Sequence, residues 1–333
     1  MSCSLTAALT FASKFRRENP MPPTLKLSSA LAERSKAKAA PGVLLPAVKE
    51  HMLGSYSAEN DRRWDIVHPS ELSHQGTFCP RAVYLRITEG PIAPKGSDFK
   101  FVTENIFDEG HAIHAKWQDR LRQATPLFGN WYCPICHKFS WNSLEPTGVG
   151  NWCGSTVEGK NYDHQWEYKE ITLDAEDEAL LVGHADGGAW TTLAEFKSVG
   201  TGSVRIEAPD IFEAAGGDLK KMWDGITRPF KTHVNQVDIY LWICQVRGLP
   251  FTSAEIIYES KWNQLVKNFT IEYSERRSTR LVDQAKAIKY AVDNRAEPAC
   301  RFPDGCENCK PYNERREVPV VRKRTARTIG GKP

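Results

Sequence analysis

Two acids and a lysine near the middle of the chain could together perform metal-dependent hydrolysis. Asp186 comes first, and Glu195 and Lys197 follow as the ends of an E-x-K triplet. Carboxylate oxygens suit Mg²⁺ or Mn²⁺, which polarise a phosphoryl oxygen and lower the pKa of bound water. Lys197 could orient that water or stabilise developing charge. The triplet alone would be read as a surface ion pair, but Asp186 upstream favours phosphodiester hydrolysis.

Short strands should position these side chains. Residues 180–184 and 190–197 are apolar runs separated by the Gly187-Gly188 pair, which predicts a hairpin with its turn at the glycines. Side chains alternate faces along a strand. Glu195 and Lys197 should therefore point the same way, and Phe196 into the opposite layer.

Asp186, Glu195 and Lys197 in this order resemble the signature of the PD-(D/E)XK nucleases. The RecB-like branch of that superfamily also carries a Gly-x-x-x-His pattern on a preceding helix, and GHAIH ends in His114 within residues 104–123, which show helical spacing. The resemblance implies that His114, Asp186 and Glu195 hold the cation with the Phe196 carbonyl, and that Lys197 positions water. Taken alone, a histidine on a helix is more often exposed or packed in the core.

A second helix carries a pair that also resembles the family. Gln236 and Tyr240 lie four apart in residues 230–246, so they share a helix face. They match a Gln-x-x-x-Tyr motif, and the resemblance implies that they contact DNA near the cut. The alternative is an amphipathic helix whose polar stripe includes them.

Four cysteines far apart in sequence predict a thiolate metal site. Cys79 stands alone, and Cys300, Cys306 and Cys309 form a cluster near the C-terminus. This arrangement resembles the iron-sulfur nucleases of the RecB-like branch, AddB and the CRISPR-associated exonucleases, and implies a [4Fe-4S] cluster that joins the two ends of the domain. The trio is spaced differently here, and four thiolates can equally hold Zn²⁺.

A C-P-x-C knuckle predicts a separate zinc site. Cys133 and Cys136 form the knuckle, and Cys153 follows downstream. A fourth ligand is needed, and His164 is a better candidate than His137, which adjoins Cys136. The alternative is a set of buried, reduced thiols.

The predicted fold class is α/β. The elements follow the αβββαβ order of the PD-(D/E)XK core, a central mixed sheet flanked by helices. Predicted strands cover residues 166–172, 180–184, 190–197, 254–258 and 266–273, and a last helix covers 277–294. We expect a poorly ordered or accessory segment over 1–63, the RecB-like nuclease domain over 64–312 with a zinc-binding insertion at about 129–165, and a basic tail over 313–333.

The overall charge does not indicate a nucleic-acid partner. A net charge of +3 over 333 residues is nearly neutral, so any basic track for DNA must be local. The clearest one is in the tail, which is expected to be solvated, with phosphate contact as the alternative. No apolar run is long enough to span a membrane, and a cytoplasmic location is expected, in a bacterial host if the chain is phage-encoded. The basic residues of this track are Arg315, Arg316, Arg322, Lys323, Arg324 and Arg327.

Together these features predict a Mg²⁺- or Mn²⁺-dependent deoxyribonuclease. The resemblance implies an exonuclease acting on DNA ends, single-stranded or with single-stranded ends, in phage recombination or replication or in CRISPR-type processing. A helicase, recombinase or integrase is a possible partner. The alternative is a non-catalytic zinc or iron-sulfur protein that binds nucleic acid or organises an assembly.

Overall fold

The structure is a computed structural model that describes residues 44–56, 63–92, 101–146, 152–157, 160–303 and 305–317. The chain divides into two units, Met1–His51 and Met52–Pro333, and the fold below belongs to the second. Most of the segment expected to be poorly ordered or accessory (1–63) lies outside the described residues. So do the tail positions Arg322, Lys323, Arg324 and Arg327.

Helices and strands alternate along the described residues. The helices are α2 (Leu44–Tyr56), α3 (Pro69–Ser73), α4 (Pro80–Glu89), α5 (Phe101–Ala124), α6 (Glu176–Ala179), α7 (Thr201–Glu207), α8 (Pro209–Ala215), α9 (Leu219–Gly225), α10 (Lys231–Arg247), α11 (Glu275–Asp293) and α12 (Lys310–Glu317). The strands are β1 (Phe128–Tyr132), β2 (Phe139–Leu144), β3 (Trp152–Val157), β4 (Lys160–Asp163), β5 (Glu167–Lys169), β6 (Ile171–Ala175), β7 (Leu181–Ala185), β8 (Gly187–Ala189), β9 (Thr192–Val199), β10 (Ser253–Ser260) and β11 (Val266–Glu272).

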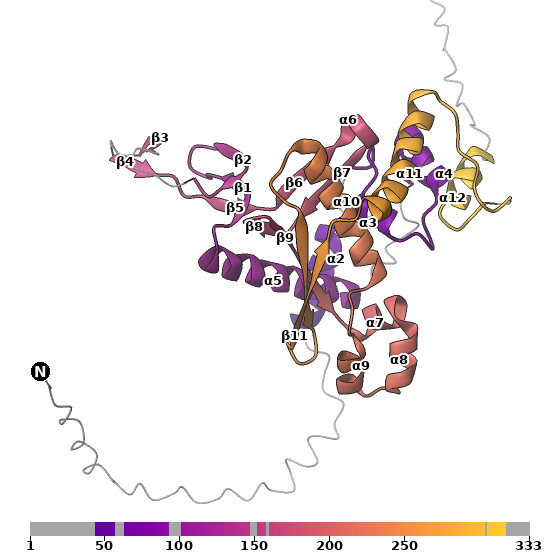
Figure 1. Cartoon of the computed structure of the whole chain (residues 1–333), viewed down its shortest axis with the longest axis horizontal. Coiled ribbons are helices and arrows are strands. Elements are labelled where there is room, and N and C mark those ends of the chain that lie inside the picture. The colour runs from indigo at the N-terminus through magenta and orange to yellow at the C-terminus, as the bar shows by residue number, and fades with distance from the viewer. Residues whose placement is uncertain are drawn as a thin grey trace, which may run out of the picture. The chain divides into compact units, whose positions relative to one another are not determined.

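A mixed sheet lies at the centre of the second unit. Among the described residues it has seven strands in the order β11-β10-β9-β8-β1-β2, with β5 also paired to β1. The β9–β10 pair is parallel, and the other pairs are antiparallel. Helix α5 packs against β9, and α10 packs against β10 and α11 (Figure 1). This is the mixed α/β sheet flanked by helices that the sequence predicts.

The predicted hairpin between residues 180–184 and 190–197 does not form, because β7 pairs with β6 and the partner of β9 is the short strand β8. Gly187 and Gly188 lie in β8 and pair with Ala194 and Leu193 of β9. The chain reverses after β8, where Trp190 has φ 53°. A Cβ on Gly188 would come within 2.5 Å of the Phe251 ring, so this glycine permits close packing inside the sheet.

Two further features differ from the expectation. The strand predicted over 166–172 is broken at Glu170 into β5, which joins the main sheet, and β6, which pairs with β7 in a separate two-stranded sheet. Three seven-residue helices, α7 to α9, lie between β9 and α10. No helix was predicted from the sequence in this segment. The helices predicted over 104–123, 230–246 and 277–294 correspond to α5, α10 and α11.

The main apolar core lies between the sheet and the helices on the α10 side. It includes Leu193 of β9, Ile239 and Leu241 of α10, Tyr258 of β10 and Leu281 of α11, all essentially inaccessible to solvent. Burial of these side chains stabilises the layers that carry the site. None of the helices in the described part of the chain has the length and apolar character needed to span a membrane.

Candidate metal and catalytic site

Asp186 lies between β7 and β8, where the chain changes its pairing partner from β6 to β9. Strand β8 pairs with β9 as far as Gly187, and residues 181–185 of the same run pair instead with β6. At the point of separation, Asp186 Oδ2 accepts the backbone N–H of Phe196 at 2.5 Å. The N–H and C=O of one strand residue point to the same side, so the Phe196 carbonyl also faces this opening. The main chain of Phe196 and the carboxylate of Asp186 therefore both line this opening.

Glu195 and Lys197 lie next to this opening on one face of β9. Lys197 Nζ is 2.6 Å from Glu195 Oε1, and Glu195 is 3% exposed. Phe196 points to the other face and stacks on Trp117 of α5, as strand alternation predicts. Burial raises the pKa of Glu195 to about 7. Burial lowers the pKa of Lys197, but the carboxylates of Glu195 and Asp186 outweigh it and raise that pKa, so the amine stays charged.

Helix α5 brings His114 to the acids. Its Nδ1 lies 3.0 Å from Asp186 Oδ1, and its ring meets the edge of Phe196. Burial alone would lower the pKa of His114, but the hydrogen bond and charge of Asp186 raise it. His111, one turn earlier, is exposed. The structure therefore places His114, and not His111, beside the acids.

Glu170 is a fifth ionisable group at the site, and it was not among the residues predicted from the sequence. Ligand atoms of His114, Glu170 and Asp186 all lie within 4.8 Å of one another. Burial and the charge of Asp186 raise the pKa of Glu170. The available signal was an acid inside a predicted strand, where charged residues are uncommon. The strand breaks at this residue, between β5 and β6.

The donor set fits a hard divalent cation. Two carboxylates and an imidazole converge within 4.8 Å; Glu195 is not one of this group, but its charge interacts with those of Asp186 and His114. Glu195 Oε2 is buried and has no hydrogen-bond partner in the described structure. A buried carboxylate oxygen without a partner is costly, and a cation would satisfy it. Oxygen and imidazole donors suit Mg²⁺ or Mn²⁺.

Gln236 and Tyr240 lie together on α10. Gln236 Nε2 donates to Tyr240 Oη at 2.6 Å, and both residues are buried. Burial, with the charges of Glu195 and Asp186, raises the pKa of Tyr240, which places its hydroxyl near the acids. The Tyr240 ring packs on Gly183, where a Cβ would approach it to 2.8 Å. The ring also borders a cavity of about 370 Å³ that includes His184, which is exposed rather than packed.

The knuckle cysteines converge with a histidine in the insertion. Sulfur or nitrogen atoms of Cys133, Cys136, Cys153 and His164 lie within 4.8 Å of one another. Cys136 Sγ is 3.4 Å from His164 Nδ1, whereas the His137 ring contacts the hydroxyl of Tyr132. Burial raises the pKa of Cys133, but backbone N–H donors and the His164 ring outweigh it and lower that pKa to about 6.

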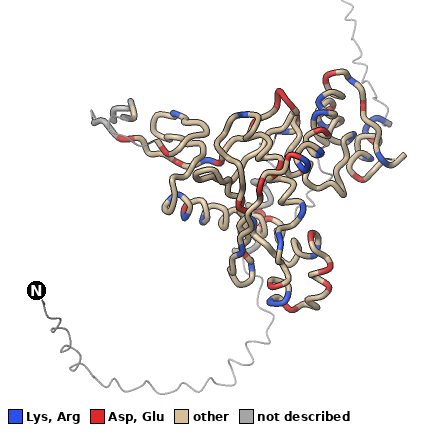
Figure 2. The backbone as a smooth tube through the Cα atoms, viewed as in Figure 1, with Lys and Arg blue, Asp and Glu red and all other residues tan. Residues whose placement is uncertain are grey.

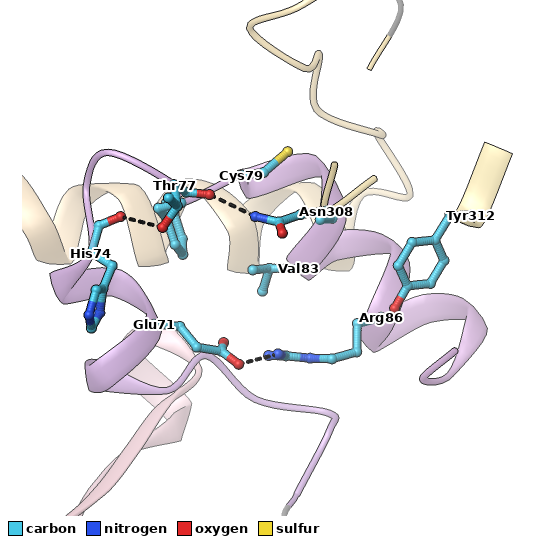
Figure 3. A pocket seen from close by; sticks show the side chains of 10 residues that line it. Glu71, His74, Thr77, Cys79, Val83, Arg86, Asn308 and Tyr312 are labelled. Carbon is cyan, nitrogen blue, oxygen red and sulfur yellow. Dashed lines mark hydrogen bonds and ion pairs between the residues drawn. The ribbon is translucent and has the colours of Figure 1, made fainter. Parts of the chain in front are cut away.

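The four distant cysteines also converge. Sγ atoms of Cys79, Cys300, Cys306 and Cys309 lie within 4.8 Å of one another. Cys79 lies at the rim of a cavity of about 370 Å³ between α3, α4 and α12 (Figure 3). Asn308 Nδ2 donates to the Thr77 carbonyl across this cavity. Residues 77–79 and residues 300–309, far apart in the sequence, therefore meet here.

The sulfur separations can be compared with those expected for Zn²⁺ and for a [4Fe-4S] cluster. Cys79 Sγ is 3.9 Å from Cys300 Sγ, and Cys306 Sγ is 3.7 Å from Cys309 Sγ. Tetrahedral Zn²⁺ with bonds of about 2.3 Å places its sulfurs about 3.8 Å apart. In a four-iron cluster each thiolate binds a different corner, and the sulfurs are roughly 6 Å apart. The two separations match those of a single tetrahedral ion.

Lys and Arg are interspersed with Asp and Glu along the described backbone (Figure 2). Of the expected basic tail, Arg315 and Arg316 are described, and both pair with Glu89, while Arg316 also pairs with Glu297. These arginines therefore join α12 to the rest of the domain.

No family model matches this chain, and no curated protein matches it. Among solved structures, the chain is similar to a protein titled SSO0001, with a TM-score of 0.34 and 14% identity over 78% of this chain and 90% of that chain. It is also similar to an alkaline exonuclease, LHK-Exo, from Laribacter hongkongensis, with a TM-score of 0.38 and 11% identity over 71% and 91%. The complex of LHK-Exo with dAMP gives 0.39 and 10% over 70% and 90%. Scores this low establish neither a shared fold nor a shared activity.

Proposed function

We propose that this protein is a metal-dependent deoxyribonuclease of the PD-(D/E)XK type. The observation that carries the proposal is the buried, unpartnered Oε2 of Glu195 beside Asp186, with a charged lysine on the same strand face. A structural ion pair would not need a second acid, an imidazole and a third carboxylate around the same opening. A metal-dependent phosphodiesterase can use all of these groups, the acids and imidazole to hold the cation and the lysine to stabilise negative charge.

We propose that the cation is held by His114, Asp186, Glu195 and the Phe196 carbonyl. Glu170 is included because its carboxylate lies within 4.8 Å of ligand atoms of His114 and Asp186. When bound, Mg²⁺ or Mn²⁺ would polarise the phosphoryl oxygen and lower the pKa of water. The ion pair with Glu195 keeps the Lys197 amine protonated and aimed at the opening, where it can orient water or stabilise negative charge.

Gln236 and Tyr240 are proposed to contact the DNA strand beside the cut. Their mutual hydrogen bond fixes the tyrosine hydroxyl, which can then donate to a phosphate oxygen. We propose that the nuclease domain covers 64–312, with the zinc insertion at about 129–165. Exonuclease action on DNA ends, in a phage or CRISPR setting, belongs to the same proposal.

The two cysteine sites are proposed to be structural. Cys133, Cys136, Cys153 and His164 would hold one Zn²⁺ in the insertion. The site of Cys79 would hold a second single ion, because the sulfur separations fit one tetrahedral metal. This second ion would close a loop of 221 residues between Cys79 and Cys300, which restricts the unfolded chain.

The test is loss of labelled DNA during incubation with purified protein and Mg²⁺ or Mn²⁺. Wild-type protein should degrade DNA, and EDTA should stop it. Lys197→Ala should lower the rate by at least about 100-fold while the protein stays folded. The matched control is Lys220→Ala, which removes an exposed lysine of α9 outside the proposed cation site and the DNA-contacting residues. Equal rates for wild type and Lys197→Ala would remove this mechanism.

A further inference from the structure

Two exposed aromatic rings lie side by side on the edge strand of the sheet. Phe139 and Trp141 of β2 stack with centroids 4.9 Å apart and planes 10° apart. They are 44% and 62% exposed. Tyr132 of β1 extends the row, with its ring 4.7 Å from that of Phe139. Large apolar rings exposed together in a row are unusual on a protein surface unless they bind something.

A bulge in the β1–β2 ladder brings Trp141 to this position. Trp131 pairs with Ser140, but Gly129 pairs with Ser143, so two residues of β2 face one residue of β1. The bulge is fixed by side chains, because Asn142 N–H donates to Asn130 Oδ1 and Asn142 Nδ2 donates to the Thr172 carbonyl. Bulges re-aim side chains, and this one is held by hydrogen bonds to two other strands.

The ring row is continuous with the proposed cation site. One cavity of about 510 Å³ is lined by Phe139 and Trp141 of the ring row and also by Glu170 and His184. Lys169 also lines it, and pairs only at 3.6 Å with the exposed Glu167, an interaction that is weak in water. A DNA strand with one of its phosphates near Glu170 would therefore extend along the cavity toward the rings, and Lys169 would lie beside its sugar-phosphate backbone.

We propose that this ring row is a stacking platform for unpaired bases, so that the substrate enters the site as single-stranded DNA. The rings can stack on a base only when its face is free, and the faces are covered in a duplex. Stacking on aromatic side chains is the usual way to hold single strands without regard to sequence. The inference that the DNA strand runs from the rings toward Glu170 rests on the proposed nuclease function. The test of the platform, however, measures binding and does not require cleavage.

The test is fluorescence anisotropy with labelled DNA of about 16 nucleotides, the upper end of the usual site sizes for single strands, in buffer without added Mg²⁺ or Mn²⁺. Wild type should bind the single strand more tightly than the matching duplex. Trp141→Ala should weaken single-strand binding by about tenfold, and Trp141→Phe should restore most of it, because a ring is kept. Trp190→Ala is the matched control, since Trp190 is 70% exposed and does not line the cavity, and its affinity should be unchanged.

The outcomes separate the platform from the nuclease. Equal single-strand affinity for wild type and Trp141→Ala would overturn the platform, as would an absence of wild-type binding or an equal preference for duplex, and cleavage with Mg²⁺ would still be judged separately. Weaker binding by Trp141→Ala in a protein that does not cleave DNA would support the platform and remove the nuclease.

Discussion

Asp186 Oδ2 accepts the amide hydrogen of Phe196 at 2.5 Å. Asp186 lies between β7, which pairs with β6, and β8, which pairs with β9 in the main sheet. The Asp186 carboxylate takes the place of the main-chain carbonyl of a neighbouring strand that would otherwise accept this N–H of β9. Because Glu195 directly precedes Phe196, this bond fixes one acid relative to the other. Preorganised charges of this kind need no rearrangement during reaction.

Asp186→Asn should separate structure from chemistry. The amide oxygen can still accept from Phe196, so the melting temperature should change by only a few degrees. The lost negative charge should reduce cleavage by at least about 100-fold. Parallel thermal melts and DNA cleavage assays measure both. A variant that is fully active would show that Asp186 serves only the strand junction.

Glu195→Gln should abolish cleavage in a protein that still folds. The amide avoids the cost of burying a negative charge at Oε2, but it also removes the charge that pairs with Lys197 Nζ at 2.6 Å. Because the two effects oppose each other, urea unfolding should give an unfolding free energy within about 2 kcal/mol of that of wild type. Glu178→Gln, an exposed acid in α6, is the control and should behave as wild type. Strong destabilisation of Glu195→Gln would assign this acid to the fold instead.

Glu170→Gln tests the residue that the structure adds. Its oxygen lies within 4.8 Å of ligand atoms of His114 and Asp186, so Mn²⁺ affinity should fall by roughly tenfold. Titration calorimetry with Mn²⁺ measures the change. Glu167→Gln, three residues earlier and exposed, is the control. Unchanged Mn²⁺ affinity in Glu170→Gln would exclude it from the cation site.

Cys309→Ser should remove one of two zinc ions and several kcal/mol of stability, because structural metal binding contributes folding free energy. Metal analysis should find about two Zn²⁺ per wild-type chain and about one in the variant. Cys244→Ser, a buried cysteine of α10 outside both sites, controls for loss of a thiol and should keep both ions. Iron with broad absorption near roughly 400 nm in protein purified without oxygen would instead indicate a cluster.

Arg277→Ala should destabilise the protein in a pH-dependent way. Arg277 Nε donates to Asp238 Oδ2 at 2.5 Å, and Asp238 is fully buried. Burial raises the pKa of Asp238, and Arg277 opposes that rise. The stability contribution of a raised carboxyl pKa is present below the unfolded value and is lost as pH rises through the folded value. Without Arg277 the folded pKa rises further, so the penalty should be largest at neutral pH.

We expect a loss of about 2 kcal/mol at pH 7, less than the about 3–5 of a fully buried pair because Arg277 is half exposed. The loss should shrink toward pH 4, where Asp238 is protonated more readily. Urea unfolding at several pH values measures this. A loss that is the same at every pH would mean that Arg277 acts by packing alone.

The sequence predicted the parts of the site that local periodicity determines. Strand alternation placed Glu195 and Lys197 on one face and Phe196 on the other, and helical spacing placed His114 on α5. The resemblance to a nuclease signature identified which acids to combine. These predictions depend on neighbouring residues alone, which is why one sequence was enough.

The remaining features depend on tertiary packing. Glu170 joins the site because a predicted strand breaks there, and no local signal locates the break. Gly187 and Gly188 read as a turn, but Phe251 from a distant segment packs over Gly188. The ring row on β2 depends on a bulge held by two other strands. Helices α7 to α9 are too short for a clear periodic pattern.

Anomalous diffraction from crystals soaked in Mn²⁺ tests the central claim most directly, because it locates the ion itself. We expect one peak within bonding distance of carboxylate oxygens of Asp186 and Glu195, with the His114 ring beside it. The same soak of Glu195→Gln crystals should give a weaker peak or none. A clear absence of Mn²⁺ at these acids in the wild type, in crystals that bind Mn²⁺ elsewhere, would contradict the account.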